Sequence, residues 1–113
     1  LDPCLFVKAI SLKSIDFNSN FIKKINENLF HGLNNLNTLS FKNNLFDNFN
    51  ISRRDLLPNL IHLDLSENSF LNYIYIENSQ KLVKLNLNGN YRLYSKSYSN
   101  KSQLLRYAYL SSL

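Results

Sequence analysis

Catalysis or metal binding needs a cluster of reactive side chains, and this 113-residue chain offers few candidates. Its histidines are His31 and His62, and its single cysteine, Cys4, has no base near it in the sequence. Gly32 and Gly89 belong to no phosphate-binding motif. The two histidines fall on opposite sides of the coil of chain derived below, so we do not expect them to share a metal ion.

Asp16 and Asp64 come nearest to a catalytic pair. They hold the same position in two coils that lie two strands apart, which separates their carboxylates by roughly 10 Å. That separation lies at the edge of the range used by inverting glycosidases. A water-exposed sheet neither encloses a substrate nor raises a carboxyl pKa, so we expect no enzyme activity and no cofactor.

The composition narrows the class of protein. A content of 44% hydrophobic and 19% charged residues is not that of a disordered chain. No run of eighteen apolar residues exists that could span a bilayer, and 113 residues allow one domain. The chain opens Leu1-Asp2-Pro3 and contains no methionine, which leads us to expect a segment of a longer protein.

An excess of basic residues gives the chain a net charge of +5. A nucleic-acid partner would suit that charge, but only Lys23-Lys24 and Arg53-Arg54 are adjacent basic pairs. Dispersed, solvated surface charge is the better interpretation, and we expect no nucleic acid. A basic nucleic-acid-binding module remains a distant alternative.

The lone cysteine, Cys4, leaves two interpretations open. It is a free buried thiol, or it pairs with a cysteine in a cap that precedes this segment.

The chain repeats a nine-residue pattern, L-x-x-L-x-[LF]-x-x-N, with Ile replacing the second Leu in the first copy. The copies begin at Leu12, Leu36, Leu60 and Leu82, in steps of 24, 24 and 22 residues. A further step of 22 leads to a degraded fifth copy, in which Leu104, Tyr107 and Tyr109 keep the apolar positions and Ser112 replaces the asparagine. We therefore interpret residues 1–113 as a single repeat segment.

Each copy predicts a short strand followed by a return path. Counting from the first leucine, positions 4 and 6 are apolar and face inward, while position 5 faces outward. The apolar residue at position 11 closes the turn, and the first copy continues with Ile25, Phe30 and Leu33. A single coil cannot bury this apolar face alone, so successive coils must stack on one another.

The position-9 asparagines, Asn20, Asn44, Asn68 and Asn90, predict a hydrogen-bonded ladder. Where the strand turns, backbone groups lose their partners, at a cost of about 1–3 kcal/mol for each buried group. An asparagine side chain carries both an acceptor and donors, so it can bond the turn of its own coil and of the neighbouring coil.

At these residues the sequence resembles the leucine-rich repeat family. The run Ile22-x-x-Ile25-x-x-x-x-Phe30-x-x-Leu33 is similar to the typical 24-residue class, which is common in receptor ectodomains such as those of Toll-like receptors. The resemblance implies an α/β repeat solenoid: a right-handed superhelix with a concave parallel β-sheet and a mostly irregular convex side.

Three places depart from the family pattern. Arg54 replaces the expected Phe at position 19, and Leu56-Leu57-Pro58 crowds near position 22. In the third copy the rim Tyr73-Ile74-Tyr75-Ile76 is strand-like. Residues 91–98 match no consensus, and we expect an irregular convex loop there.

The resemblance implies recognition of a protein or another extracellular ligand by the repeat scaffold of a receptor or adhesion-type ectodomain. That places the chain outside the plasma membrane or in secretions, with membrane contact only through flanking segments. The alternative is an intracellular leucine-rich repeat adaptor in the cytoplasm, which suits a chain with one cysteine.

Polar side chains that project from the concave strands form the candidate binding surface. They are Asp16, Asn18, Ser40, Lys42, His62, Asp64, Ser66, Lys84, Asn86 and Asn88. Solvent-facing strand positions must be polar in any case, and these columns hold no aromatic anchor. This stretch is therefore either a contact surface or scaffold that supports a contact elsewhere.

Two sequons, at Asn50 and Asn100, would accept N-linked glycans if the protein is secreted. Their number is no more than chance predicts in a chain with 19 asparagines.

Overall fold

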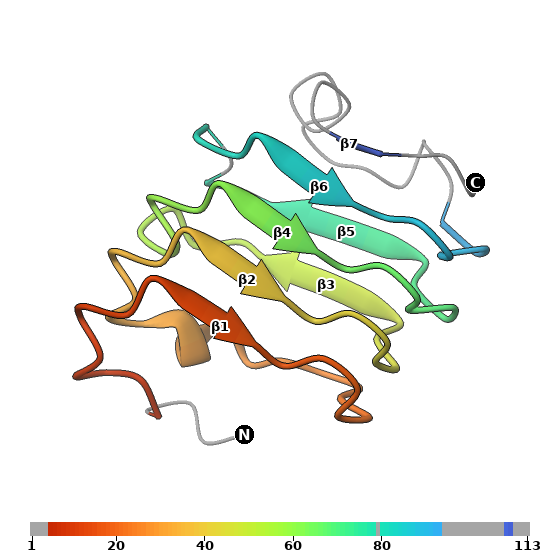
Figure 1. Ribbon diagram of the computed structural model, residues 1–113, viewed down its shortest axis with the longest axis horizontal. Helices are drawn as coiled ribbons and strands as arrows, with labels where there is room; N and C mark the ends of the chain where they lie inside the picture. The colour runs from red at the N-terminus through yellow and green to blue at the C-terminus, as the bar shows by residue number, and fades with distance from the viewer. Residues whose placement is uncertain (1–4, 79, 94–107, 110–113) are drawn as a thin grey trace.

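Short parallel strands lie side by side in two layers. The computed structural model describes residues 5–78 and 80–93 and the backbone of residues 108–109. One sheet has the order β1-β2-β4-β6-β7, and the other pairs β3 with β5 (Figure 1). The strands are β1 (Ser14–Asp16), β2 (Thr38–Ser40), β3 (Asn48–Ile51), β4 (His62–Asp64), β5 (Tyr73–Ile76), β6 (Lys84–Asn86) and β7 (Ala108–Tyr109).

The register of the five-stranded sheet follows the sequence repeat. Ser14 pairs with Thr38, Thr38 with His62 and His62 with Lys84, and all of these residues occupy position 3 of their copies. Parallel neighbours need a long crossover, and the remainder of each coil provides it. The chain is thus a parallel-strand β-solenoid with little helix, which confirms the prediction of a repeat solenoid.

The fifth strand begins one residue later than the repeat predicts. Ala108 pairs with Leu85, which holds position 4, where a further step of 22 residues would have placed Tyr107. Leu104 and Tyr107 themselves lie outside the described residues. The sequence before β7 departs from the repeat pattern, so spacing alone did not determine this register.

Side chains along a strand point alternately inward and outward, and this explains which strand residues enter the core. The residues at positions 4 and 6 of the second, third and fourth coils are buried: Leu39, Phe41, Leu63, Leu65, Leu85 and Leu87. The equivalent Ile15 and Phe17 in the first coil are only partly buried. A coil therefore buries its apolar side chains fully when it has a neighbour on both sides.

The second layer confirms the strand-like segment expected at Tyr73–Ile76, which is β5, and adds β3, a strand that the sequence pattern did not predict. The second and third coils each carry a four-residue strand there, and these strands pair in register from Asn48 with Tyr73 to Ile51 with Ile76. Their buried residues alternate, with Phe49 and Ile51 on β3 and Ile74 and Ile76 on β5. Every second residue of these segments is buried. An extended strand allows this because its successive side chains point to opposite faces.

The first coil has a 3-10 helix, η1 (Glu27–Phe30), in place of a second-layer strand. The Asn26 side chain caps it by accepting the backbone N–H of Asn28 at 3.0 Å. Within residues 5–78 and 80–93 it is the only helix, so the α/β part of the predicted class is not what this fold shows. Nowhere in the described part is a helix long and apolar enough to cross a membrane.

The turn after the asparagine differs between coils. Phe46 is buried at position 11 in the second coil, as predicted, but Phe70 at the same position of the third coil is exposed. Leu71 is buried instead, and its N–H donates to the Asn68 carbonyl at 2.9 Å. Because of this tight turn, the residue that faces the core is at position 12 of the third coil and not at position 11. The third coil is also two residues shorter than the two coils before it.

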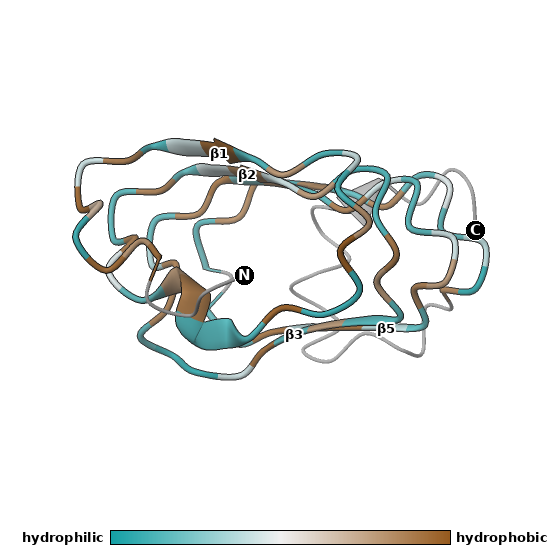
Figure 2. Cartoon of the chain, turned by 90° about the horizontal axis from the view of Figure 1, so that it is seen from below, coloured by the Kyte–Doolittle hydropathy of each residue, from teal (hydrophilic) through white to brown (hydrophobic). Residues whose placement is uncertain are grey.

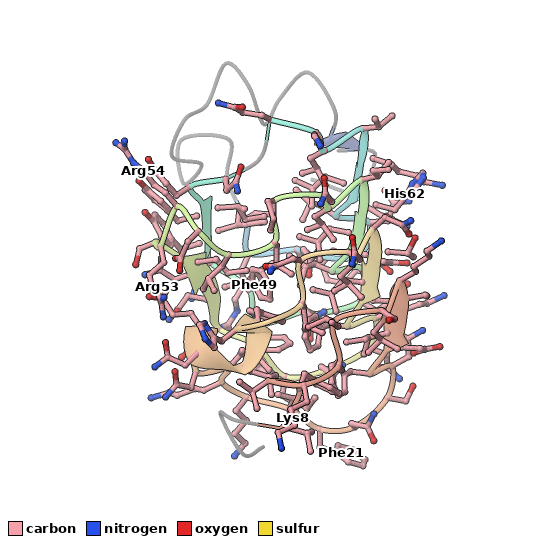
Figure 3. The ribbon with its side chains drawn as sticks, turned by 90° about the vertical axis from the view of Figure 1, so that its left-hand side faces the viewer. Lys8, Phe21, Phe49, Arg53, Arg54 and His62 are labelled. Atoms are coloured by element: carbon pink, nitrogen blue, oxygen red, sulfur yellow. The ribbon has the colours of Figure 1, made fainter. Side chains whose placement is uncertain are left out.

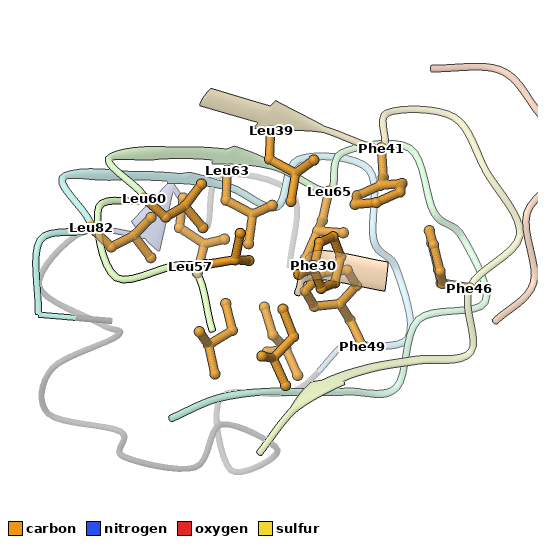
Figure 4. Packing of buried hydrophobic residues seen from close by; sticks show 14 of the residues in the cluster. Phe30, Leu39, Phe41, Phe46, Phe49, Leu57, Leu60, Leu63, Leu65 and Leu82 are labelled. Atoms are coloured by element: carbon orange, nitrogen blue, oxygen red, sulfur yellow. The ribbon is translucent and has the colours of Figure 1, made fainter. Parts of the chain in front are cut away.

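The core lies between the two layers (Figure 2) and centres on aromatic rings at its N-terminal half. Phe41 stacks on Phe17 with a centroid distance of 5.1 Å and meets the edge of Phe46 at 5.3 Å. Phe49 lies 5.7 Å from both Phe41 and Phe46 (Figure 4). These rings join the first coil, the second coil and β3 into one packed unit.

Candidate functional site

The outward side of the five-stranded sheet, here called the front face, carries the predicted binding residues. It is formed by positions 3, 5 and 7 of the coils, and side chains including His62 project from it (Figure 3). A shallow hollow of about 280 Å³ lies across β2, β4 and β6. Its polar lining consists of Thr38, Ser40, His62, Asp64, Lys84 and Asn86.

Position 5 residues of the front face hold the chain where it leaves the strand. Asp16 Oδ1 accepts the N–H of Asn18 at 2.8 Å, and Asp64 Oδ1 accepts the N–H of Ser66 at 2.9 Å. Asn86 Oδ1 accepts the N–H of Asn88 at 3.1 Å in the same way. An aspartate or asparagine that bonds the N–H two residues on forms an Asx-turn. The carboxylates are therefore engaged in shaping the backbone.

The second coil has Ser40 at position 5, whose hydroxyl bonds its own backbone more weakly than an Asp or Asn side chain does. Asn18 of the first coil replaces it: its Oδ1 accepts the Lys42 N–H at 2.8 Å and the Ser40 hydroxyl at 2.6 Å. Hydrogen bonds within and between coils therefore restrict the side chains of the front face before any ligand binds.

The structure divides the predicted residues by accessibility. Ser66 is buried, and its hydroxyl donates to Asp64 Oδ1 at 2.6 Å, so it is less accessible to a ligand than the exposed members of the set. Lys42, His62 and Lys84 are exposed. Asp16 is exposed, while Asn18, Ser40, Asp64, Asn86 and Asn88 are half-buried.

The asparagine side chains at position 9 bond two coils at once. Asn44 Nδ2 donates to the Phe41 carbonyl of its own coil at 2.9 Å and to the Phe17 carbonyl of the preceding coil at 3.0 Å. Asn68 repeats this with the carbonyls of Leu65 at 2.9 Å and Phe41 at 3.0 Å. Asn90 does the same with Leu87 and Leu65, and all three of these asparagines are buried.

The side-chain oxygens of the same residues accept backbone N–H groups of the preceding coil. Asn44 Oδ1 accepts the N–H groups of Asn20 and Ile22, both at 3.0 Å. Asn90 Oδ1 accepts the N–H of Asn68 at 3.0 Å. Asn20 is exposed, and its side chain bonds only the carbonyls of its own coil, Phe17 and Asn18, within the described residues.

Position 8 has a backbone conformation that the sequence pattern did not reveal. Its φ is 59° at Ser19, 58° at Asn43, 60° at Glu67 and 78° at Gly89. Left-handed backbone costs a non-glycine residue about 1–2 kcal/mol. Only Gly89 signals it in the sequence, and one glycine in four copies did not suffice to predict it.

The remaining predicted residues lie elsewhere. Asn50 is exposed on β3, in the other layer from the front face. Asn100 and Cys4 lie outside the described residues. His31 follows η1 and His62 lies on β4, and no group of three or more potential metal ligands occurs in the part of the chain that the structure describes.

Ionisable side chains on and after β3 and β5 form pairs that the sequence pattern did not reveal. The Tyr75 hydroxyl donates to Glu77 Oε2, which raises the pKa of that phenol, and Arg54 contacts Glu77 at 3.1 Å. Arg53 contacts Asp55 at 2.7 Å, and its hydrogen bond lowers the pKa of that carboxyl. Exposed pairs of this kind contribute little to stability.

Comparisons of the chain with protein-family models, curated proteins and solved structures found no match. The comparisons therefore place the chain in no family.

Proposed function

We propose that this chain is a segment of a leucine-rich repeat scaffold that recognises a protein or another extracellular ligand, as in receptor or adhesion-type ectodomains. In this proposal the five-stranded sheet is the concave side of a right-handed superhelix, and the front face is the binding surface.

The observation that supports this proposal best is the hydrogen-bonded order of the front face. Asp64 and Asn18 bind neighbouring backbone groups, while Lys42, His62 and Lys84 stand exposed among them. A surface whose side chains are already restricted loses little conformational entropy when it binds. Mixed lysine, imidazole and carboxylate groups suit a polar partner such as a folded protein.

A photo-crosslinking amino acid placed on the front face tests this proposal in living cells. We expect His62→p-benzoylphenylalanine to capture a partner, because His62 is exposed beside Lys84 at the shallow hollow. Arg54→p-benzoylphenylalanine is the matched control, since Arg54 is exposed on the opposite layer. Capture from position 54 alone, or from neither position, would contradict the proposal.

The compartment belongs to the same proposal and has its own test. A membrane-impermeant amine-reactive biotin should label the protein on intact cells if it is extracellular. Labelling only after the cells are opened would favour the alternative, an intracellular adaptor, which the single cysteine in 113 residues suits.

A further inference from the structure

A pocket of about 190 Å³ lies in the second layer, between the first and second coils. The first coil contributes Lys24, Ile25 and Phe30 to its lining, and the second coil contributes Phe46 and all four residues of β3. Figure 2 places η1 and β3 in this layer, across the core from β1 and β2. Both walls consist of described residues, so the pocket does not depend on what precedes residue 5.

Hydrogen bonds join the two coils at both ends of this pocket. The Leu45 N–H donates to the Ile22 carbonyl at 2.9 Å, and the Ser52 N–H donates to Glu27 Oε2 at 2.8 Å. Between these two bonds the first coil advances by five residues and the second coil by seven. The two segments therefore cannot pair residue for residue as β3 and β5 do, and the pocket lies between them.

The strand β3 directs backbone groups into this gap. The Ile51 carbonyl faces the third coil, where it accepts the Glu77 N–H at 2.9 Å, while the Ser52 N–H faces Glu27 of the first coil. Successive residues of an extended strand direct their N–H and C=O groups to opposite sides. The backbone groups of Asn50 therefore face the first coil, and no described residue of that coil bonds them.

The inner wall of the pocket is apolar. Phe46 and Phe49 are buried, with ring centroids 5.7 Å apart, and Phe30 and Ile51 are buried beside them (Figure 4). A cavity of about 150 Å³ with apolar walls is large enough to bind benzene. A pocket of about 190 Å³ therefore has room for one aromatic ring or a branched hydrocarbon group of similar size.

The outer rim of the pocket is polar and positively charged. Lys24, Asn48 and Asn50 are exposed there. Lys24 is the only charged residue in the lining, since Asp47, which accepts Asn48 Nδ2 at 3.1 Å, is not part of it. A carboxylate accepts strong hydrogen bonds from ammonium and N–H groups. The rim therefore favours an anionic group over a cationic one.

We propose that this pocket binds a small organic carboxylate with an apolar body. The hydrocarbon part lies against Phe46 and Phe49, and the carboxylate accepts hydrogen bonds from Lys24 and from the Asn50 N–H. The proposal is independent of the front face, because the pocket is in the other layer. Charge complementarity with Lys24 and the size of the apolar wall together define this class of ligand.

Phenylacetate is the probe, because it combines one aromatic ring with one carboxylate. We expect NMR titration of the isotope-labelled chain to shift the amide signals of Asn48 and Asn50 saturably, with a dissociation constant below about 5 mM. Expression in bacteria leaves Asn50 without a glycan. Phenylacetamide, which has no charge, should bind about fivefold more weakly, the effect expected of one exposed ion pair.

Two adjacent lysines provide a matched pair of variants. Lys24→Gln should weaken phenylacetate binding about fivefold and leave phenylacetamide binding unchanged, because only the charged probe uses the ammonium group. Lys23→Gln is the control, since Lys23 is equally exposed but does not line the pocket, and it should bind both probes as the native chain does.

A third variant fills the pocket. Ile25 is half-buried in its wall, and Ile25→Trp should abolish the binding of both probes while circular dichroism shows a folded chain. A phenylacetate dissociation constant above about 5 mM would overturn the proposal. Equal affinity for the two probes, or equal losses from the substitutions at positions 23 and 24, would show that the rim does not recognise a carboxylate. Unchanged binding by a folded Ile25→Trp variant would place the ligand elsewhere.

Discussion

Single amide side chains replace the backbone pairing that each coil loses where its strand ends. Asn68 Nδ2 donates to the carbonyls of Phe41 and Leu65, and its Oδ1 accepts the Phe46 N–H at 3.4 Å. No hydrocarbon side chain can satisfy these buried groups, and an aspartate would bury a charge. The contribution of each asparagine should therefore depend on how deeply its coil is covered.

Replacing the central asparagine tests this dependence. Asn68→Leu should lower the free energy of unfolding by about 3 kcal/mol or more, because it leaves several buried polar groups unpaired at about 1–3 kcal/mol each. Ser66→Ala should cost only about 1 kcal/mol, since the backbone N–H of residue 66 still bonds Asp64.

Asn20→Leu is the matched control, because Asn20 is the exposed member of the series. It should cost less than about 1 kcal/mol in the same urea titration. Equal losses for the substitutions at positions 68, 66 and 20 would show that the ladder does not hold the coils together.

The second-layer strands depend for their stability on the core against which they pack. Phe49 and Ile51 alternate with Asn48 and Asn50 on β3, and Ile74 and Ile76 alternate with Tyr73 and Tyr75 on β5. Each strand is only four residues long, and a two-stranded sheet is marginal without a packed face. Its inward apolar residues against the core must therefore supply most of its stability.

Substitutions at two adjacent residues of β5 distinguish the contribution of core packing to stability from that of an exposed side chain. Ile74→Ala should destabilise the protein by about 2–5 kcal/mol, because it opens a cavity in the core. Tyr73→Ala changes a side chain that is 38% exposed and should cost less than about 1 kcal/mol. Thermal unfolding of both variants checks the difference, and a Tyr73 variant that loses as much as the Ile74 variant would argue against the layer arrangement.

The whole molecule carries a net charge of +5, and two of its arginines form ion pairs. Arg53 pairs with Asp55 and Arg54 pairs with Glu77, so the one adjacent arginine pair of the sequence presents no free basic patch. Lys42, His62 and Lys84 lie on the front face beside Asp16 and Asp64. Mixed charge of this kind suits a protein partner better than a phosphate backbone.

A salt titration with duplex DNA tests that conclusion. We expect no saturable binding of a duplex of about 20 base pairs at physiological salt, at protein concentrations of about 10 µM, because affinity for DNA requires clustered phosphate contacts. Fluorescence anisotropy measures it. A dissociation constant below about 1 µM that rises steeply with salt would instead favour the nucleic-acid-binding alternative.

The sequence by itself determined the stacking of coils. Copies that start at residues 12, 36, 60 and 82 place Ile15, Leu39 and Leu63 at one position, and a repeat that buries one face requires that they align in neighbouring strands. The same spacing places Asn44 and Asn68 where each meets the preceding coil. These features depend only on which residue follows which, so the printed chain contains them.

Only the tertiary structure decided which contacts join neighbouring coils away from the strands of the front face. The use of Asn18 to hold the turn after Ser40 and the pairing of β3 with β5 both depend on groups that another coil supplies. A local pattern cannot rank such contacts, because their free energies arise between residues more than twenty positions apart.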